Sequence, residues 1–261
     1  MISITTIKSQ LANNELTREQ VNELREDQRK GVQALLKRYD ATQMRMASIE
    51  QMHLDMSTYE LELRQQGYQA ICGVDEVGRG PLAGPVTAAA VILPTDFKLL
   101  GLTDSKKLSK ENREQYAAYI KEHAVDYQIV SLSAKEIDET NILLATKRAM
   151  MQAIQQLRVA ADYLLLDAIE LPIGTSQRSL IKGDSRSVSI AASSVLAKVW
   201  RDDYMEKLAH VYPEYGFEQH AGYGTKQHLD ALERHGMTSE HRRTFRPVLE
   251  RGKSRIHPKD Q

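Results

Sequence analysis

The sequence has little cysteine, no long apolar run and no excess of either charge. Its one cysteine, Cys72, excludes an internal disulfide and a zinc cluster built on cysteines, and it fits a reducing compartment best. No apolar run approaches the roughly 20 residues that a membrane-spanning helix needs. The first residues also lack the basic region and long apolar stretch of a secretory signal. We therefore expect a soluble, cytoplasmic protein with no membrane segment.

The charges of the sequence balance, because Lys and Arg together number 35 and Asp and Glu together also number 35. Net charge therefore neither indicates nor excludes a nucleic-acid partner, since a neutral total can hide a basic face. Hydrophobic residues make up 41% and charged residues 27%, so disorder throughout the chain is not expected. A chain of 261 residues accommodates one large domain, or a standard domain with an accessory piece.

The composition changes near residue 68. Before it, the chain is polar and free of proline, and Thr17 and Gln20 have the spacing of a helix-capping box. Apolar residues recur at helical spacing after that cap, and a further helix is expected over residues 49–65. We predict a small helical domain over residues 1–68, serving either as a spacer or as an element that grips substrate. The second role would depend on its basic residues, Arg25, Arg29, Lys30, Lys37, Arg38 and Arg45.

After residue 68, apolar runs typical of strands alternate with helical segments. This alternation predicts an α/β domain over residues 69–257, with a central sheet covered by helices and a short tail at 258–261. The expected strands are 70–77, 86–93, 127–132 and 163–166, and the expected helices are 109–125, 133–136 onward, 141–157, 189–211 and 225–235.

Two adjacent carboxylates, Asp75 and Glu76, lie inside the first expected strand. Successive strand residues face opposite sides, so both cannot be ordinary surface residues if the strand is in the core. Burying an unpaired carboxylate costs several kcal/mol. The pair therefore favours a functional role over a structural one.

Two further acids occupy positions where α/β proteins build their sites. Asp167 ends an apolar strand, and Asp184 lies in a loop just before a long helix. Oxygen ligands without cysteine or closely spaced histidine suit Mg²⁺ or Mn²⁺ rather than Zn²⁺. Two such ions can activate a water and stabilise the leaving oxygen in phosphodiester hydrolysis. For Asp184 alone, a structural role as a loop acid stays equally open.

A glycine-rich loop, residues 78–85, follows the acidic pair. Its glycines allow close approach of a ligand to the backbone, and Arg79 offers a planar fork for phosphate. A dinucleotide-binding turn is rejected, because prolines interrupt the loop and a strand rather than a helix comes next.

Four ordered segments of the sequence resemble a known family, the type-two ribonuclease H of bacteria, ribonuclease HII. They are GVDEVGRGPLAGPV at 73–86, DSKKLS at 104–109, KGDSRSVSIAASSVLAKVWRD at 182–202 and HAGYGTKQH at 220–228, and the later HGMTSEHRRTF also fits. The resemblance covers roughly residues 69–257. It implies a ribonuclease H-like mixed sheet flanked by helices. Residues 1–68 lie outside these motifs, and Ala168 stands where many members have glycine.

The resemblance also implies roles for individual residues. Asp75, Glu76, Asp167 and Asp184 would be the catalytic, metal-binding acids. Gly78, Arg79 and Gly80 would sense the 2′-hydroxyl that distinguishes RNA from DNA, and Tyr223 would stack on the following sugar. Phosphates would be met by Lys106 or Lys107 and by the pair Ser193 and Ser194, and for each of these a structural role stays equally open. The basic residues expected to be either phosphate ligands or solvated surface charges are Lys198, Arg201, Arg242, Arg243, Arg246 and Arg251.

The implied activity is hydrolysis of the phosphodiester 5′ of a ribonucleotide, leaving 3′-hydroxyl and 5′-phosphate ends. The expected partners are RNA–DNA hybrids and duplex DNA with embedded ribonucleotides, the expected cofactors are one or two Mg²⁺ or Mn²⁺ ions, and the expected form is a monomer. Two alternatives stay open: a type-three ribonuclease H acting on longer hybrids, and a non-catalytic nucleic-acid-binding protein of the same fold.

Overall fold

The computed structural model describes residues 2–251 and 257–260. Its contacts divide the chain into two units, Met1–Leu54 and Asp55–Gln261. The boundary therefore lies before residue 68, where the sequence had placed it. Helix α4 (Thr58–Gln65) belongs to the second unit, because Leu63 packs with Ile71 and Leu165. Residues 252–256 of the expected catalytic domain, and Gln261 of the expected tail, fall outside the described residues.

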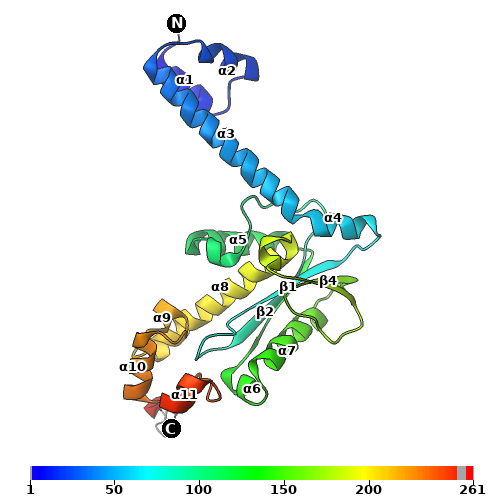
Figure 1. The fold of residues 1–261 in the computed structure, drawn as a ribbon, viewed down its shortest axis with the longest axis vertical. Coiled ribbons are helices and arrows are strands. Elements are labelled where there is room, and N and C mark those ends of the chain that lie inside the picture. The colour runs from blue at the N-terminus through cyan, green and yellow to red at the C-terminus, as the bar shows by residue number, and fades with distance from the viewer. Residues whose placement is uncertain (1, 252–256, 261) are drawn as a thin grey trace. The chain divides into compact units, whose positions relative to one another are not determined.

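The first unit is helical, as predicted. Helices α1 (Ile4–Ala12), α2 (Arg18–Arg25) and the first part of α3 (Lys30–Met56) surround a small apolar core (Figure 1). The capping box is confirmed: the Gln20 amide donates to Thr17 Oγ1 and the Thr17 amide donates to Gln20 Oε1. The core residues are Ile7, Leu11, Val21, Val32 and Leu36.

Two helices in this part of the sequence, α3 and α1, differ from the prediction. Helix α3 is one helix of 27 residues that ends at Met56, whereas the sequence suggested a separate helix over 49–65. Helix α1 was not expected, because its β-branched Ile and Thr residues have modest helix propensity. Its Ser3 cap and the burial of Ile7 and Leu11 stabilise it instead.

The second unit is built on a mixed sheet of five strands in the order β3-β2-β1-β4-β5. Strand β1 pairs with β2 antiparallel and with β4 parallel, so the sheet has the predicted mixed character. The polar edge strand β5 was not predicted, since its alternating exposed residues resemble a loop in sequence. The strands are β1 Ile71–Val77, β2 Val86–Ile92, β3 Asp126–Leu132, β4 Tyr163–Asp167 and β5 Ser176–Leu180.

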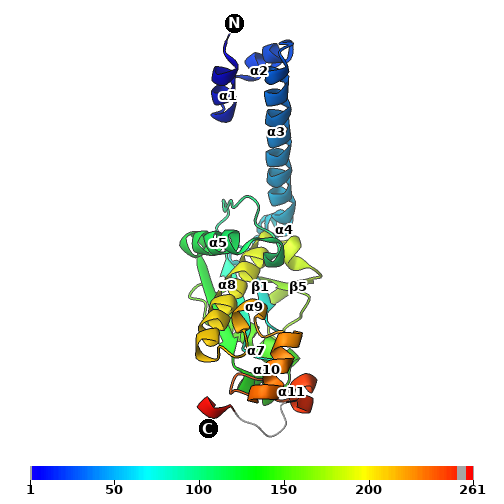
Figure 2. The same ribbon diagram turned by 90° about the vertical axis from the view of Figure 1, so that its left-hand side faces the viewer.

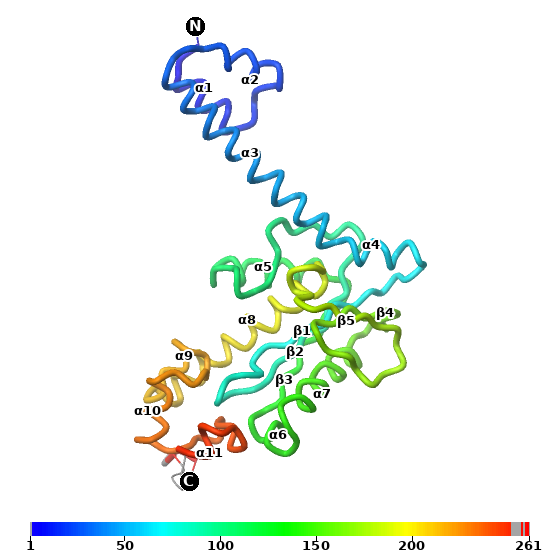
Figure 3. The backbone as a smooth tube through the Cα atoms, in the orientation of Figure 1, coloured from blue at the N-terminus to red at the C-terminus, as the bar shows by residue number. Residues whose placement is uncertain are grey.

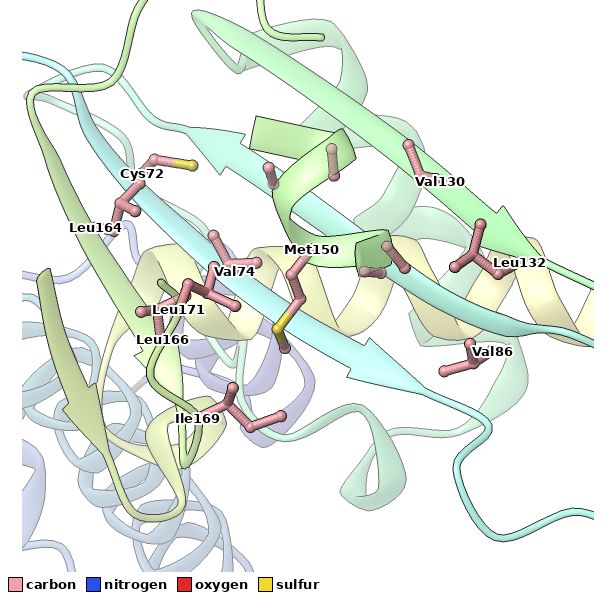
Figure 4. Packing of buried hydrophobic residues seen from close by; sticks show 14 of the residues in the cluster. Cys72, Val74, Val86, Val130, Leu132, Met150, Leu164, Leu166, Ile169 and Leu171 are labelled. Carbon is pink, nitrogen blue, oxygen red and sulfur yellow. The ribbon is translucent and has the colours of Figure 1, made fainter. Parts of the chain in front are cut away.

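Two long helices cover the two faces of this sheet, α7 (Ile142–Gln155) and α8 (Val188–Val211) (Figure 1). Strand alternation turns Cys72 and Val74 toward α7, where they join Met150 in the main apolar cluster (Figure 4).

The opposite face of β1 meets α8 at Gly73. A Cβ at Gly73 would lie 2.1 Å from the main-chain carbon of Ser189, so only glycine allows β1 and α8 to approach this closely. This contact brings the first two turns of α8 against the strand that carries the acidic pair.

The remaining short helices lie around these elements. Helix α5 (Lys110–His123) packs against α8 (Figure 2). Helices α9 to α11 lie near the carboxyl-terminal half of α8 (Figure 3). In the part of the chain that the structure describes, no helix is both long and apolar enough to cross a membrane. The others are η1 Ser105–Lys107, α6 Ala134–Asp138, η2 Gly183–Ser185, α9 Phe217–His220, α10 Lys226–His235, α11 Arg246–Arg251 and η3 Pro258–Asp260.

Candidate active site

Asp75 lies in the middle of the sheet and is 4% exposed. One of its carboxylate oxygens accepts a hydrogen bond of 2.7 Å from the Glu76 amide. Burial, followed by the charges of Glu76 and Asp167, raises the pKa of Asp75 well above its usual range, and a hydrogen bond from Ser194 only partly offsets this. A buried carboxylate beside two others is a position where a cation would be strongly stabilised.

Glu76 faces the other side of β1 at the point where the strand ends. Arg79 Nη1 lies 3.3 Å from Glu76 Oε1, whereas Glu76 Oε2 is buried and has no hydrogen-bond partner among the residues that the structure describes. Burial raises the pKa of Glu76, and the nearby Arg79 charge counteracts part of that rise. Its unpartnered oxygen is a free ligand atom.

The parallel pairing of β1 with β4 brings Asp167 to the same edge of the sheet as the acidic pair. Asp167 Oδ1 accepts a 2.6 Å hydrogen bond from the Gly183 amide, which fixes the loop that carries Asp184. Asp184 is buried, and its pKa is raised by burial first and then by the charges of Asp104 and Asp167. The structure thus brings Asp184 into the neighbourhood of the other three acids.

The four carboxylates therefore share one electrostatic environment. Within residues 2–251 and 257–260, however, no three Asp, Glu, His or Cys side chains already form a set that could hold a metal ion. The donors still fit a divalent ion of the Mg²⁺ or Mn²⁺ kind, because all are carboxylate oxygens and one of them, Glu76 Oε2, is buried without a partner.

The glycine loop and Tyr223 lie together beside these acids. Gly78 has φ +90°, a conformation that favours glycine, and Arg79 is exposed. A Cβ at Gly80 would lie 3.3 Å from the Tyr223 ring, whose side chain is 47% exposed. Segments far apart in the sequence thus form one continuous surface.

The two lysines differ in their surroundings. Burial would by itself lower the pKa of Lys106, but the charges of Asp104, Asp184 and Asp75 raise it, which places this ammonium among the acids. Lys107 Nζ donates to Ser185 Oγ at 3.2 Å. Lys106 therefore interacts with the charges of the acids, and Lys107 contacts the residue that follows Asp184.

The expectation that Ser193 meets a phosphate is wrong. Its side chain is fully buried, and its hydroxyl donates to the Gly73 carbonyl at 2.7 Å, so it connects α8 to β1. Ser194 lies closer to the site, since its hydroxyl contacts both Ser105 and Asp75.

The basic residues expected to be phosphate ligands or surface charges have different surroundings. Arg201 and Arg242 are buried, so they are neither phosphate ligands nor solvated charges. The Arg243 amide bonds to Asp138. Three others form ion pairs with carboxylates on the protein itself: Lys198 with Asp202, Arg246 with Glu250 and Arg251 with Glu233.

A buried histidine pair supports Tyr223, and the sequence analysis did not single it out. The Thr238 amide donates to His241 Nδ1, so the proton of His241 is on Nε2, which lies 3.0 Å from His228 Nε2. His228 Nδ1 then donates to the Tyr223 carbonyl at 3.0 Å. The only signal was the presence of both histidines within recognisable motif segments.

The mixed sheet with acids near the ends of the parallel strands β1 and β4 has the ribonuclease H fold. Ribonuclease H2 of Pyrococcus horikoshii has a similar structure, with a TM-score of 0.63 and 24% identity over 70% of this chain and 97% of that one. A crystal structure of Bst-RNase HIII in complex with Mn²⁺ gives a TM-score of 0.53 at 19% identity, covering 74% of this chain and 73% of that one. Both likenesses confirm the fold.

The sequence identifies the particular family. The ribonuclease HII family model matches residues 72–249, and that of the ribonuclease HII N-terminal domain matches residues 3–64. Ribonuclease HII of Shouchella clausii is 61% identical over 98% of this chain and 99% of its own length, and that of Halalkalibacterium halodurans is 57% identical over 89% and 88%. The chain belongs to the ribonuclease HII family and is an endonuclease of the ribonuclease H class, type two rather than type three.

Proposed function

We propose that this endonuclease cuts the phosphodiester 5′ of a ribonucleotide, both in RNA–DNA hybrids and at single ribonucleotides embedded in duplex DNA. The observation that carries the proposal is the close approach of Gly80, in the glycine loop, to the exposed Tyr223 next to the acidic cluster. A loop backbone can approach a sugar closely enough to detect a 2′-hydroxyl, and an aromatic ring can stack on the next sugar. Together they provide recognition of a ribonucleotide followed by DNA.

In this proposal Asp75, Glu76, Asp167 and Asp184 hold one or two Mg²⁺ or Mn²⁺ ions. The fit depends on the hard oxygen donors and on the unpartnered Glu76 Oε2. Divalent ions bound there would supply the Lewis acidity that phosphodiester hydrolysis needs.

The other side chains orient the substrate. Lys106 stands among the acids and is the candidate for the phosphate next to the scissile bond. Arg79 is half-exposed beside Glu76, where its guanidinium can meet the backbone of the ribonucleotide strand. Tyr223 limits the space at the following sugar, which favours a deoxyribose there. The protein would act as a monomer in the cytoplasm, on ribonucleotides left in DNA.

The test uses a labelled DNA duplex with one embedded ribonucleotide, an all-DNA duplex of the same sequence and a long RNA–DNA hybrid, each with Mg²⁺ or Mn²⁺. We expect a cut immediately 5′ of the ribonucleotide, with 3′-hydroxyl and 5′-phosphate ends, and no cut in the all-DNA duplex. Cleavage of the hybrid alone would contradict the proposed substrate, and binding without cleavage of any duplex would favour a non-catalytic role.

A further inference from the structure

Two arginines of the second unit are buried without a carboxylate partner. Arg201, on α8, is 1% exposed, and Arg242 is 0% exposed. In the described part of the chain neither forms a salt bridge. Burying an unpaired charge is expensive unless hydrogen bonds replace the lost water, so such residues need a specific reason to be where they are.

All their hydrogen bonds go to main-chain carbonyls, and most of these belong to the glycine loop. Arg242 donates to the carbonyls of Gly78 at 2.5 Å, Arg79 at 3.0 Å and Gly84 at 3.0 Å. Arg201 donates to Pro85 at 2.9 Å and Ala83 at 3.2 Å, and also to Ala221, two residues before Tyr223, at 3.0 Å.

The loop sequence leaves room for Arg201. A Cβ at Gly78 would lie 2.3 Å from Arg201 Nε, and one at Gly84 would lie 2.4 Å from Met205 Sδ and 3.3 Å from Arg201 Nη2. Both glycines also have positive φ. Gly78 therefore accommodates the Arg201 side chain on one side of the loop as well as any ligand on the other side.

The bonds to Arg242 fix the orientation of two peptide groups. In a trans peptide the carbonyl and the amide N–H point in opposite directions. With the carbonyls of Gly78 and Arg79 directed at Arg242, the amides of Arg79 and Gly80 are directed away from it. Across residues 2–251 and 257–260, neither of these two amides donates a hydrogen bond, so both are available to a ligand beside Tyr223.

We propose that Arg242 and Arg201 are positioning residues that determine the selectivity of this enzyme for an isolated ribonucleotide. Their hydrogen bonds fix the backbone of the glycine loop, so that the amides of Arg79 and Gly80 keep a constant distance from Tyr223. The inference rests on the proposed function, and it assigns to the buried arginines a role in recognition without contact to the nucleic acid.

The decisive variant is Arg242→Lys, which keeps the charge but replaces a planar fork by one ammonium that cannot reach three separated carbonyls. We expect kcat on the single-ribonucleotide duplex to fall about 100-fold, because small misplacement of a recognition group has effects of that size. KM should stay within about twofold, since Lys106 is not bonded to Arg242 and the Arg79 side chain remains exposed beside Glu76.

The long RNA–DNA hybrid provides the second readout. Every register of a continuous RNA strand offers a 2′-hydroxyl, so a loosened loop still finds one. We therefore expect the ratio of single-ribonucleotide cleavage to hybrid cleavage to fall at least about tenfold. The matched control is Arg64→Lys. Among the described residues Arg64 also donates only to main-chain carbonyls, those of Gln69 and Leu93, so its substitution should leave this ratio unchanged.

The outcomes distinguish failure of the proposed function from failure of the inference about the arginines. If the wild-type protein does not cut the single-ribonucleotide duplex, the proposed function itself fails. If the wild type cuts and Arg242→Lys loses both activities in equal proportion, or neither, the arginine is merely structural and the inference is overturned. If Arg242→Lys does not fold, Arg201→Lys is assayed with the same expectation, because Arg201 connects Ala83 and Pro85 of the loop to Ala221 near Tyr223, and loss of these bonds would change the spacing of the loop and Tyr223.

Discussion

Two buried aspartates of the same sheet have opposite surroundings. Asp126 begins β3 and is 2% exposed, and Asp75 lies in β1 and is 4% exposed. The Asp126 carboxylate accepts hydrogen bonds from the main-chain amides of Tyr127, Arg158 and Val159 at 2.9, 2.5 and 3.0 Å. Asp75 has two other carboxylates as neighbours instead.

The two pKa shifts follow from these surroundings. Burial raises the pKa of both groups, but at Asp126 the three amide donors, together with the charge of Arg158, more than reverse the effect and lower the pKa below its usual range. At Asp75 the neighbouring charges add to burial and raise the pKa further. Burial of an acid therefore does not indicate function by itself, since only the neighbours distinguish a stabilising carboxylate from a reactive one.

The largest expected effect is that of Asp75→Asn on turnover. An amide is a far poorer ligand for a divalent ion, so we expect cleavage of the single-ribonucleotide duplex to fall on the order of 10³-fold or more while duplex binding persists. Because the substitution removes a charge that its neighbours repel, thermal stability without metal should stay equal or rise. Near-normal cleavage, measured on the same gel as the wild type, would contradict the assignment of this acid.

Asp126→Asn should produce the reverse pattern. The amide can accept fewer and weaker hydrogen bonds from the three main-chain donors, so the free energy of unfolding should fall by about 2–4 kcal/mol. Cleavage per folded molecule should remain normal. Urea unfolding and an activity assay below the transition check both parts. Unchanged stability would show that the amide bonds around Asp126 contribute little.

A third prediction concerns the effect of burial on the pKa of two bases, His228 and His241. Burial lowers the pKa of His228 to about 4 and that of His241 to about 3, so both stay neutral when folded. The unfolded imidazoles bind protons below about pH 6.5. Protonation of the unfolded imidazoles therefore leaves the free energy of unfolding unchanged above pH 6.5 and lowers it as the pH falls toward 4. At pH 5 the free energy of unfolding is lower by about 2 kcal/mol for one imidazole.

The control for this pH dependence is His241→Asn, whose side-chain oxygen can still accept from the Thr238 amide. Comparison of the two proteins removes the contribution of the carboxylates, which is common to both. We expect the loss of unfolding free energy between pH 7 and pH 5 to be smaller in the variant by that same amount. Parallel curves for the two proteins would contradict the neutral-pair interpretation.

The smallest expected effect concerns backbone strain beside Asp167. Ala168 has φ +50°, a left-handed conformation that costs a residue with a Cβ about 1 kcal/mol or more. Ala168→Gly should therefore raise the free energy of unfolding by up to about 1 kcal/mol, less the entropy that glycine adds to the unfolded chain. Denaturant unfolding measures the change, and a clear loss of stability would show that the Ala168 side chain makes contacts that outweigh its strain.

Much of the site could be predicted from sequence because its determinants are local. Asp75 and Glu76 stand out in an apolar strand, and Asp167 ends another. Ser193 could not be assigned correctly, because its motif gives no sign that its hydroxyl bonds to Gly73, which is 120 residues earlier in the chain. Strand β5 was missed because an edge strand needs few apolar residues.

The sequence by itself determined the family, the mixed α/β class and the identity of the acids, since strand patterns and motif order are read along the chain. The tertiary structure alone decided which buried charges have partners. Two of the three amides that bond to Asp126 are more than thirty residues away, and Arg201 and Arg242 bond to a loop more than a hundred residues away. These contacts form only when the chain folds, because each joins groups whose spacing along the sequence carries no periodic signal.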